Sequence, residues 1–331
     1  MIWGNGPGIV VFLSTSLTCK MAKPNHIELP TGERIPILYE DRSVLAIDKP
    51  AGWMLVPFNW QKTSRNLQAA LTSSIAAKDF WARSRGLKFL RFVHRLDSDT
   101  SGVLLLAKSP GAVHSIGALF ESRRMEKVYL AVVLGTPTQR EWTCRLKLAP
   151  DPAVVGQMKV DARQGKDAET RFRVLQDKGG LTLVEAHPVT GRTHQIRIHL
   201  AESGYAVIGD PLYGPPAVVK EERPPRGDGR RFTPALSPPA ASRAGVPPAC
   251  ASGDAKPEQG RRDACPTLPP SGKGGRGNSR QASGGPRLWD NRMGLRAVRL
   301  SYADPFTRRR VDIRAPCEQF VREYGFDIPT L

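Results

Sequence analysis

The character of the amino-acid sequence changes abruptly after Tyr213 and Gly214. Residues 215–290 contain 14 of the chain's 29 prolines and 11 of its 31 glycines, and they contain almost no clusters of aliphatic side chains. Such a segment cannot bury enough apolar surface to offset the conformational entropy lost on ordering it, so we expect it to be disordered. Any folded domain must then combine the residues before this insertion with those after it.

The residues that follow the insertion show a folded pattern again. Residues 296–302 and 309–314 are predicted strands on either side of a turn, and residues 317–324 are a predicted short helix that ends before Gly325. A single hairpin and one short helix have too little surface to form a core of their own. We therefore expect residues 291–331 to complete a catalytic domain that residues 35–214 begin.

Short apolar runs within residues 35–214 predict buried strands, and apolar residues at helical spacing predict helices between them. The predicted strands are 44–47, 103–107, 128–134, 172–175 and 181–186, and the predicted helices are 66–84, 111–124 and 193–203. These elements alternate without a regular strand–helix–strand repeat, which favours a mixed α/β (α+β) domain over a doubly wound one. We expect a central, largely antiparallel sheet with flanking helices.

Residues 1–34 lack this pattern. No Lys or Arg precedes their apolar run Ile9–Leu13, and no small-residue cleavage site follows it, so it is a poor match to a signal peptide. We expect an N-terminal extension that is disordered or mis-started, with Met21 as the true first residue. No apolar stretch approaches the roughly 20 residues needed to span a membrane. The five cysteines are scattered without a C-x-x-C pair, which fits a reducing cytoplasm.

The chain is strongly basic, with a formal net charge of +18 and a pI of about 10.1. The insertion contributes 13 Lys and Arg against 7 Asp and Glu, so the remainder is basic in its own right. Neutralisation of phosphates by Lys and Arg drives nucleic-acid binding, which makes nucleic acid the expected partner. Charge alone leaves RNA, DNA and an anionic membrane surface open.

The segment from His94 to Gly102 carries the densest chemistry. It places a basic residue, two carboxylates, three hydroxyls and a glycine in a loop that enters a predicted buried strand. One interpretation is a catalytic loop; the simpler one is a polar turn in which Asp97 or Asp99 accepts backbone hydrogen bonds. A calcium loop is excluded, because the twelfth position from Asp97 is Lys108 where such a loop needs Glu.

Two further segments hold candidate residues. Tyr129 lies in a predicted strand, where a tyrosine is commonly a core or edge residue, and Arg192 and Arg197 flank a predicted helix. His194 and His199 are five residues apart and diverge on a helix, with no Glu between them in the spacing of a zinc protease. We predict no metal site.

Four separated blocks resemble the RluA family of pseudouridine synthases, in the order in which that family has them. The blocks are Ile37–Gly52, His94-Arg95-Leu96-Asp97 with Thr100-Ser101-Gly102, Lys127–Ala131, and Gly191–Arg197 with Gly209–Gly214. Each block alone is a weak signal, but four in register make chance agreement implausible. The resemblance covers residues 35–214 and 295–331 and implies a pseudouridine synthase-like catalytic domain.

The resemblance implies a role for each candidate residue. Asp97 is the expected catalytic carboxylate, Arg197 the cation that keeps it ionised through paired hydrogen bonds, and Tyr129 the ring that stacks on uracil. Arg95 is expected to help hold the RNA open once the target uridine has left its stack. The remaining predicted RNA-binding residues are His94, Arg192, His194 and Gln195.

The resemblance also bounds the reaction and its partners. Conversion of uridine to pseudouridine needs no redox step, so we expect no cofactor, and no protein partner is inferred. Many relatives carry an N-terminal RNA-binding domain of the S4 type. The residues before Ile35 are too few for one, which leaves ribosomal and transfer RNA both open as substrates. The alternative function is a catalytically inactive RNA-binding or ribosome assembly protein of the same fold. A glycoside hydrolase is disfavoured, because Asp97 and Asp99 face no second acidic block.

Overall fold

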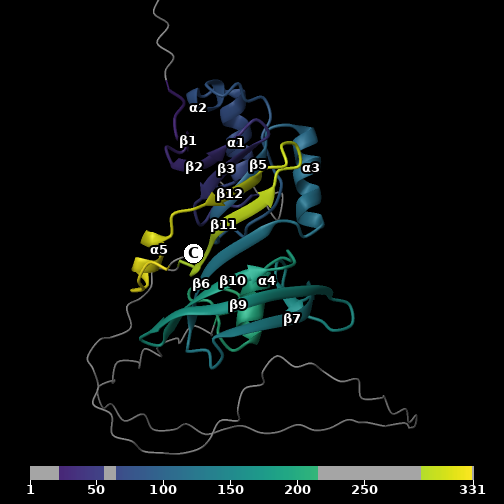
Figure 1. Ribbon diagram of the computed structural model, residues 1–331, viewed down its shortest axis with the longest axis vertical. Helices are drawn as coiled ribbons and strands as arrows, with labels where there is room; N and C mark the ends of the chain where they lie inside the picture. Colours follow the sequence, from purple (N-terminus) through teal and green to yellow (C-terminus); the bar gives the residue numbers. More distant parts are fainter. Residues whose placement is uncertain (1–21, 56–64, 215–291, 330–331) are drawn as a thin grey trace, which may run out of the picture.

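The computed structural model describes residues 22–55, 65–214 and 292–329 (Figure 1). The insertion predicted over 215–290 lies outside the described residues, as do residues 1–21 of the predicted extension. No helix in the described ranges is long and apolar enough to cross a membrane.

One twelve-stranded sheet forms the centre of the described chain, with the order β1-β2-β3-β5-β11-β6-β10-β9-β7-β8, β4 beside β5 and β12 beside β11. The strands are β1 (His26–Glu28), β2 (Arg34–Glu40), β3 (Val44–Lys49), β4 (Arg91–Phe92), β5 (Ser101–Ala107), β6 (Glu126–Leu134), β7 (Glu141–Pro150), β8 (Met158–Val160), β9 (Lys166–Lys178), β10 (Leu181–Pro188), β11 (Leu295–Ala303) and β12 (Arg310–Arg314). Only β5 and β11 pair in parallel among these strands. The prediction of a mixed, largely antiparallel sheet is confirmed.

The C-terminal strand β11 lies in the middle of this sheet, between β5 and β6 (Figure 1). Its parallel contact with β5 pairs Arg296 with Ser101 and Ala297 with Gly102. A Cβ atom on Gly102 would lie 2.0 Å from the carbonyl oxygen of Ala297, and the residue has a φ of 109°, so only glycine fits there. The C-terminal residues therefore share one sheet with the first part of the chain.

Helices cover both faces of the sheet. On one face, α1 (Leu67–Ala76) and α2 (Phe80–Arg83) pack against β3 and β5, and α4 (Gln195–Glu202) packs against β9 and β10. On the other face, α3 (Pro110–Glu121) packs against β3 and β5, and α5 (Glu318–Glu323) packs against β6 and β10. Tyr129 contacts the core beneath α1 and the core beneath α4, so it lies where those two clusters meet.

Several elements differ from the sequence predictions. The helix predicted over 66–84 is two helices, because Lys78 takes a left-handed conformation with φ of 58° between α1 and α2. Strand β1 falls inside the predicted extension 1–34, where Ile27 is fully buried opposite Ile35, so the ordered sheet begins earlier than expected. Strands β2, β4, β7 and β8 were not predicted.

Candidate active site

Asp97 lies in the loop between β4 and β5, and a buried lysine fixes the shape of that loop. The fully buried Lys49 donates from Nζ to the carbonyl oxygens of Pro50 (3.0 Å), Ser98 (2.7 Å) and Thr100 (2.9 Å). Burial lowers the pKa of Lys49 to about 8, and the negative charges of the nearby aspartates oppose that shift. The Lys49 ammonium therefore ties the backbone that follows Asp97 to the backbone after β3.

His94 anchors the start of the same loop. Its Nε2 accepts a hydrogen bond from the backbone amide of Leu105 at 2.9 Å, and its ring stacks on Phe120 with centroids 4.7 Å apart. Burial lowers the pKa of His94 to about 3, and the charge of Lys127 adds to that effect. The imidazole is therefore neutral, and the nitrogen facing β5 is occupied by the protein itself.

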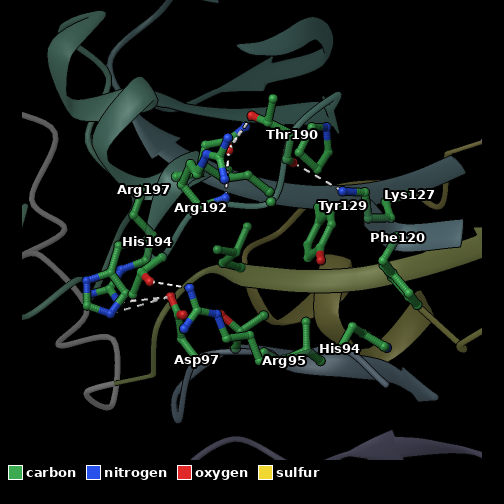
Figure 2. Close-up of a pocket in the computed structure, with 18 of the residues that line it drawn as sticks. His94, Arg95, Asp97, Phe120, Lys127, Tyr129, Thr190, Arg192, His194 and Arg197 are labelled. Carbon is green, nitrogen blue, oxygen red and sulfur yellow. Dashed lines mark hydrogen bonds and ion pairs between the residues drawn. The ribbon is translucent and has the colours of Figure 1, made fainter. Parts of the chain in front are cut away.

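The opposite wall of the site comes from α4. Arg197 has a side chain that is 3% exposed, and its Nη1 donates to Oδ2 of Asp97 at 3.1 Å (Figure 2). The paired hydrogen bonds expected between these residues are made to a different carboxylate. Nε and Nη2 of Arg197 each lie 2.7 Å from an oxygen of Asp210. Arg197 therefore joins a buried aspartate to the candidate catalytic one.

Asp210 is a site residue that sequence reasoning missed. Its side chain is fully buried, and Oδ1 also accepts hydrogen bonds from the amides of Leu212 (2.9 Å) and Tyr213 (3.1 Å). Burial would raise the pKa of Asp210, but the hydrogen bonds and charge of Arg197 and the two amides bring it below its ordinary value. Its place in the Gly209–Gly214 block, a motif without an assigned role, was the available signal.

His194 and Tyr213 border Asp97 on the same side. His194 has a left-handed backbone with φ of 55° immediately before α4, and its Nδ1 lies 2.9 Å from the hydroxyl of Tyr213. Its Nε2 is 3.9 Å from Oδ2 of Asp97. Burial lowers the pKa of His194 and the charge of Asp97 opposes this, while the guanidinium of Arg197 lies over the Tyr213 ring at 5.1 Å.

Gln195 organises the loop that leads into α4. Its Oε1 accepts from Oγ1 of Thr190 (2.6 Å) and the amide of Arg192 (2.9 Å), and its Nε2 donates to the Glu169 carbonyl and Thr170 hydroxyl, both at 2.9 Å. Gln195 is buried, with 4% exposure. Its amide is thus occupied by the protein, so Gln195 positions the loop and offers no free group to RNA.

Arg95 and Arg192 are the predicted RNA-binding residues with accessible guanidinium groups. Arg95 is exposed, and its Nη2 donates to the hydroxyl of Thr193, which links the Asp97 loop to the approach to α4. Arg192 is partly exposed, and its Nε donates to the carbonyl of Asp167 at 3.1 Å. Both lie at the rim of the site.

These residues surround a pocket of about 410 Å³, here called the Asp97 pocket (Figure 2). Tyr129 lies inside it, between Asp97 on one side and Lys127 on the other. Burial, with a contribution from the charge of Asp97, raises the pKa of the Tyr129 hydroxyl, so the phenol stays neutral. Among the described residues, Oδ1 of Asp97 accepts no hydrogen bond, which leaves one carboxylate oxygen open to a ligand.

The structure thus brings together Asp97, Arg197 and Tyr129, the three predicted catalytic residues, in one basic pocket. All five predicted RNA-binding residues also line it, although His94 and Gln195 are engaged by the protein. In the described ranges, no group of three or more His, Cys, Asp or Glu side chains is arranged to hold a metal ion. A carboxylate beside an aromatic ring in a basic pocket suits chemistry on a flat, uncharged base of a polyanionic chain.

Comparison with solved structures defines the class of protein. The structure of human RNA pseudouridylate synthase domain containing 4 matches with a TM-score of 0.55 at 18% identity, covering 89% of this chain and 94% of that one. The human domain containing 1 matches with a TM-score of 0.52 at 22% identity, covering 86% and 84%. At these identities the likeness shows the fold, which is that of an RNA pseudouridylate synthase domain.

Sequence comparison places the chain within that class. A family model described as RNA pseudouridylate synthase matches residues 43–202. The dual-specificity RNA pseudouridine synthase RluA of Vibrio cholerae is 32% identical over 191 residues, which cover 58% of this chain and 73% of that protein. The ribosomal large subunit pseudouridine synthase C of Vibrio vulnificus is 36% identical over 181 residues, covering 54% and 52%. The chain belongs to the RluA family of pseudouridine synthases.

The match to several relatives is partial. An uncharacterized RNA pseudouridine synthase of Chlorobaculum parvum is 37% identical over 185 residues, which cover 54% of this chain and 55% of that protein. The chain spans about half the length of this relative and of the Vibrio vulnificus protein.

Proposed function

We propose that this chain isomerises uridine to pseudouridine in ribosomal or transfer RNA, with Asp97 as the catalytic carboxylate. The observation that carries the proposal is the geometry of that carboxylate. One oxygen of Asp97 is held 3.1 Å from the buried Arg197, and the other accepts no hydrogen bond from the described residues in a pocket that also holds Tyr129.

The reaction breaks the N1–C1′ glycosidic bond, turns the base and forms a C5–C1′ bond. The C5 proton is lost and N1 gains one, so substrate and product are isomers and no oxidant or reductant is consumed. Asp97 can act as a nucleophile at C1′ or C6, or it can remove a proton, and all three roles require the ionised form. The charge of Arg197 favours that form in a pocket where a bound base excludes water.

Tyr129 and the basic rim account for substrate binding in this proposal. Stacking of the uracil on the Tyr129 ring, worth roughly 1–3 kcal/mol, offsets part of the cost of unstacking the target nucleotide. Arg95 lies at the mouth of the pocket, next to Asp97, where a guanidinium can hold the displaced strand. The relatives named for ribosomal RNA and for dual specificity support RNA as the substrate class. The proposal places the protein in the cytoplasm, where that RNA is made and modified in bacteria.

The replacement Asp97→Asn tests the proposal. It keeps the shape of the side chain and removes the anion, so we expect single-turnover pseudouridine formation to fall by at least about 1,000-fold. RNA affinity should stay within about threefold, because Asp97 contributes negative charge to a site for a polyanion. Pseudouridine is measured in total RNA from cells with and without the gene and in the same RNA treated with each protein. A parent protein that binds RNA and makes no pseudouridine would favour the alternative, an inactive RNA-binding protein of this fold.

A further inference from the structure

A second part of the Asp97 pocket lies beyond Tyr129. Figure 2 shows Lys127 on the far side of the Tyr129 ring from Asp97, with Phe120 and His94 next to it. Lys127 and Tyr129 are two residues apart on β6, so both side chains point to the same face of the sheet. When a base stacks on Tyr129 with its sugar toward Asp97, Lys127 therefore faces the part of the RNA that flanks the target nucleotide.

Lys127 is a mostly buried cation that lacks a carboxylate partner. Its Nζ donates to the carbonyl oxygen of Thr190 at 3.1 Å, and in the described part of the chain it forms no ion pair. An ammonium group has three donors, so two remain available. Burial lowers the pKa of Lys127 to about 8, because the charged ammonium loses hydration and no nearby anion among the described residues compensates for that loss.

Cations outnumber carboxylates in the Asp97 pocket. Arg95, Arg123 and Arg192 also line it, and none of these guanidinium groups has an ion-pair partner among the described residues. Glu121 lines the pocket as well, and it is exposed. Arg197, by contrast, is balanced by Asp97 and Asp210. Lys127 differs from the unbalanced arginines in lying beyond Tyr129, on the far side of the ring from Asp97.

We infer that Lys127 forms a subsite for one phosphate of the RNA backbone next to the target uridine. The inference rests on the proposed function for the position of the target base. An ammonium held in place by the Thr190 carbonyl gives a charge-assisted hydrogen bond to a non-bridging phosphate oxygen. The phosphate in turn supplies the negative charge that the pocket lacks around Lys127.

The test is a double-mutant cycle between one side chain and one phosphate. The probe is a short synthetic stem–loop RNA with a single uridine in its loop, in which each flanking phosphate in turn is replaced by a neutral methylphosphonate. RNA affinity is measured for the parent, for Lys127→Gln and for Lys127→Arg. Lys88→Gln serves as a matched control, because Lys88 is an exposed lysine outside the Asp97 pocket.

We expect one methylphosphonate position to weaken binding of the parent by about tenfold, as loss of a charge-assisted hydrogen bond does. Lys127→Gln should lose about as much with unmodified RNA, lose nothing further with that methylphosphonate, and reduce the slope of log affinity against log salt by about 0.7. Lys127→Arg should retain most of the affinity. Lys88→Gln should stay fully sensitive to the methylphosphonate.

Independent, additive losses for Lys127→Gln and every methylphosphonate would overturn the inference. If circular dichroism shows that Lys127→Gln does not fold, the methylphosphonate RNAs are compared on the parent and on Lys127→Arg instead. In that case, a parent whose affinity is unchanged by both methylphosphonates overturns the inference. Binding and isomerisation are scored separately. A protein that makes pseudouridine but shows no coupling between Lys127 and a phosphate refutes only the phosphate subsite. A protein that shows this coupling but makes no pseudouridine refutes only the proposed function.

Discussion

Two cavities in this molecule each hold a carboxylate between two basic groups, and they differ in what is left open. The second, here called the Glu40 cavity, has a volume of about 660 Å³ and is lined by Glu40, Arg85 and Lys108 at the other end of β5. Glu40 accepts from Nε of Arg85 at 2.9 Å on one oxygen and from Nζ of Lys108 at 2.7 Å on the other. In the Asp97 pocket, the described residues engage only one oxygen of the carboxylate.

The difference separates an ion pair whose carboxylate is closed on both oxygens from one whose carboxylate has an open oxygen. Burial would raise the pKa of Glu40, and the two cations more than offset that effect, so the group is ionised with both oxygens occupied. Its partners also bind backbone carbonyls, Arg85 that of Trp81 and Lys108 that of Asp41, so the network joins loops to β2. A carboxylate closed in this way stabilises the fold, whereas one with an oxygen free can form a bond to a substrate.

Arg197→Lys should give the largest change. An ammonium is a single point without the planar fork of a guanidinium, so it cannot reproduce the contacts that three separate nitrogens of Arg197 make with Asp210 and Asp97. We expect single-turnover isomerisation to fall on the order of 100-fold from misplacement of Asp97. Stability should fall by about 3–5 kcal/mol, because the buried Asp210 loses its paired hydrogen bonds. Asp210→Asn is the matched control and should keep more activity, since the Arg197–Asp97 bond survives. Full activity of the Lys variant would remove the distinction between the two networks.

Acid pH should affect α4 before it affects the Glu40 cavity. His199 on α4 is fully buried, both ring nitrogens lack a hydrogen-bond partner among the described residues, and burial lowers its pKa from 6.5 to about 4. The unfolded chain therefore takes up the proton first. The contribution to stability is complete above pH 6.5 and is lost as the pH falls toward 4.

The variant His199→Phe isolates this contribution. Melting temperature measured between pH 7 and 4 should fall less steeply for His199→Phe than for the parent, because an apolar ring has no proton to gain. His114→Gln, which replaces an exposed histidine on α3, should leave the slope of the parent unchanged. The Glu40 pair should weaken only at lower pH, because the pKa of Glu40 lies below 4.5. Parallel pH profiles for the parent and His199→Phe would contradict the assignment.

Glu40→Gln should have a smaller effect. The Glu40 side chain is 20% exposed, so its ion pairs contribute about 1 kcal/mol or less, equivalent to a few degrees in melting temperature. Pseudouridine formation should stay within about twofold of the parent, since the Glu40 cavity lies at the far end of β5 from Asp97. A tenfold loss of activity at unchanged stability would mean that this ion pair belongs to the catalytic machinery.

Replacement of residues 216–288 by a short Gly/Ser linker should have the smallest effect. The composition of the insertion predicts disorder, and the closure entropy of a disordered loop depends only logarithmically on its length, so melting temperature and single-turnover rate should match those of the parent. RNA affinity should fall modestly, with a shallower salt dependence, because the insertion carries more basic than acidic residues. A collapse of either melting temperature or rate would show that the insertion is structural or catalytic.

The sequence predicted the elements that consist of continuous apolar runs. It did not predict a strand whose apolar residues alternate with polar ones, or a helix break that depends on one backbone conformation. β5 and β6 were predicted because Leu104 and Leu130 lie within buried hydrophobic stretches. β7 was missed although Trp142, Cys144 and Leu148 alternate with polar residues, which is the pattern of a strand with one buried face. The break before α2 depends on the backbone of Lys78, a residue type that carries no turn signal.

The family motifs predicted which residues belong to the candidate site. They did not predict which hydrogen bonds and ion pairs join those residues. Asp97, Tyr129 and Arg197 are in distant parts of the chain, and no local pattern indicates that Arg197 divides its donors between two aspartates. The role of Lys49 was equally hidden, because an apolar strand ending in lysine predicts a solvated side chain, whereas this one is fully buried beneath the Asp97 loop.

The position of β11 sets the order in which the site is assembled during synthesis. β5 follows Asp97 and β6 carries Tyr129, yet these two strands are joined in the sheet through β11, which comes more than 160 residues after β6 in the chain. A nascent chain that has left the ribosome as far as α4 therefore holds every predicted catalytic residue without the strand that joins them. Such long-range closure is slow, and until it occurs the exposed edges of β5 and β6 invite wrong pairings. The complete Asp97 pocket, which Leu295 of β11 helps to line, therefore forms only in molecules whose translation has passed residue 303.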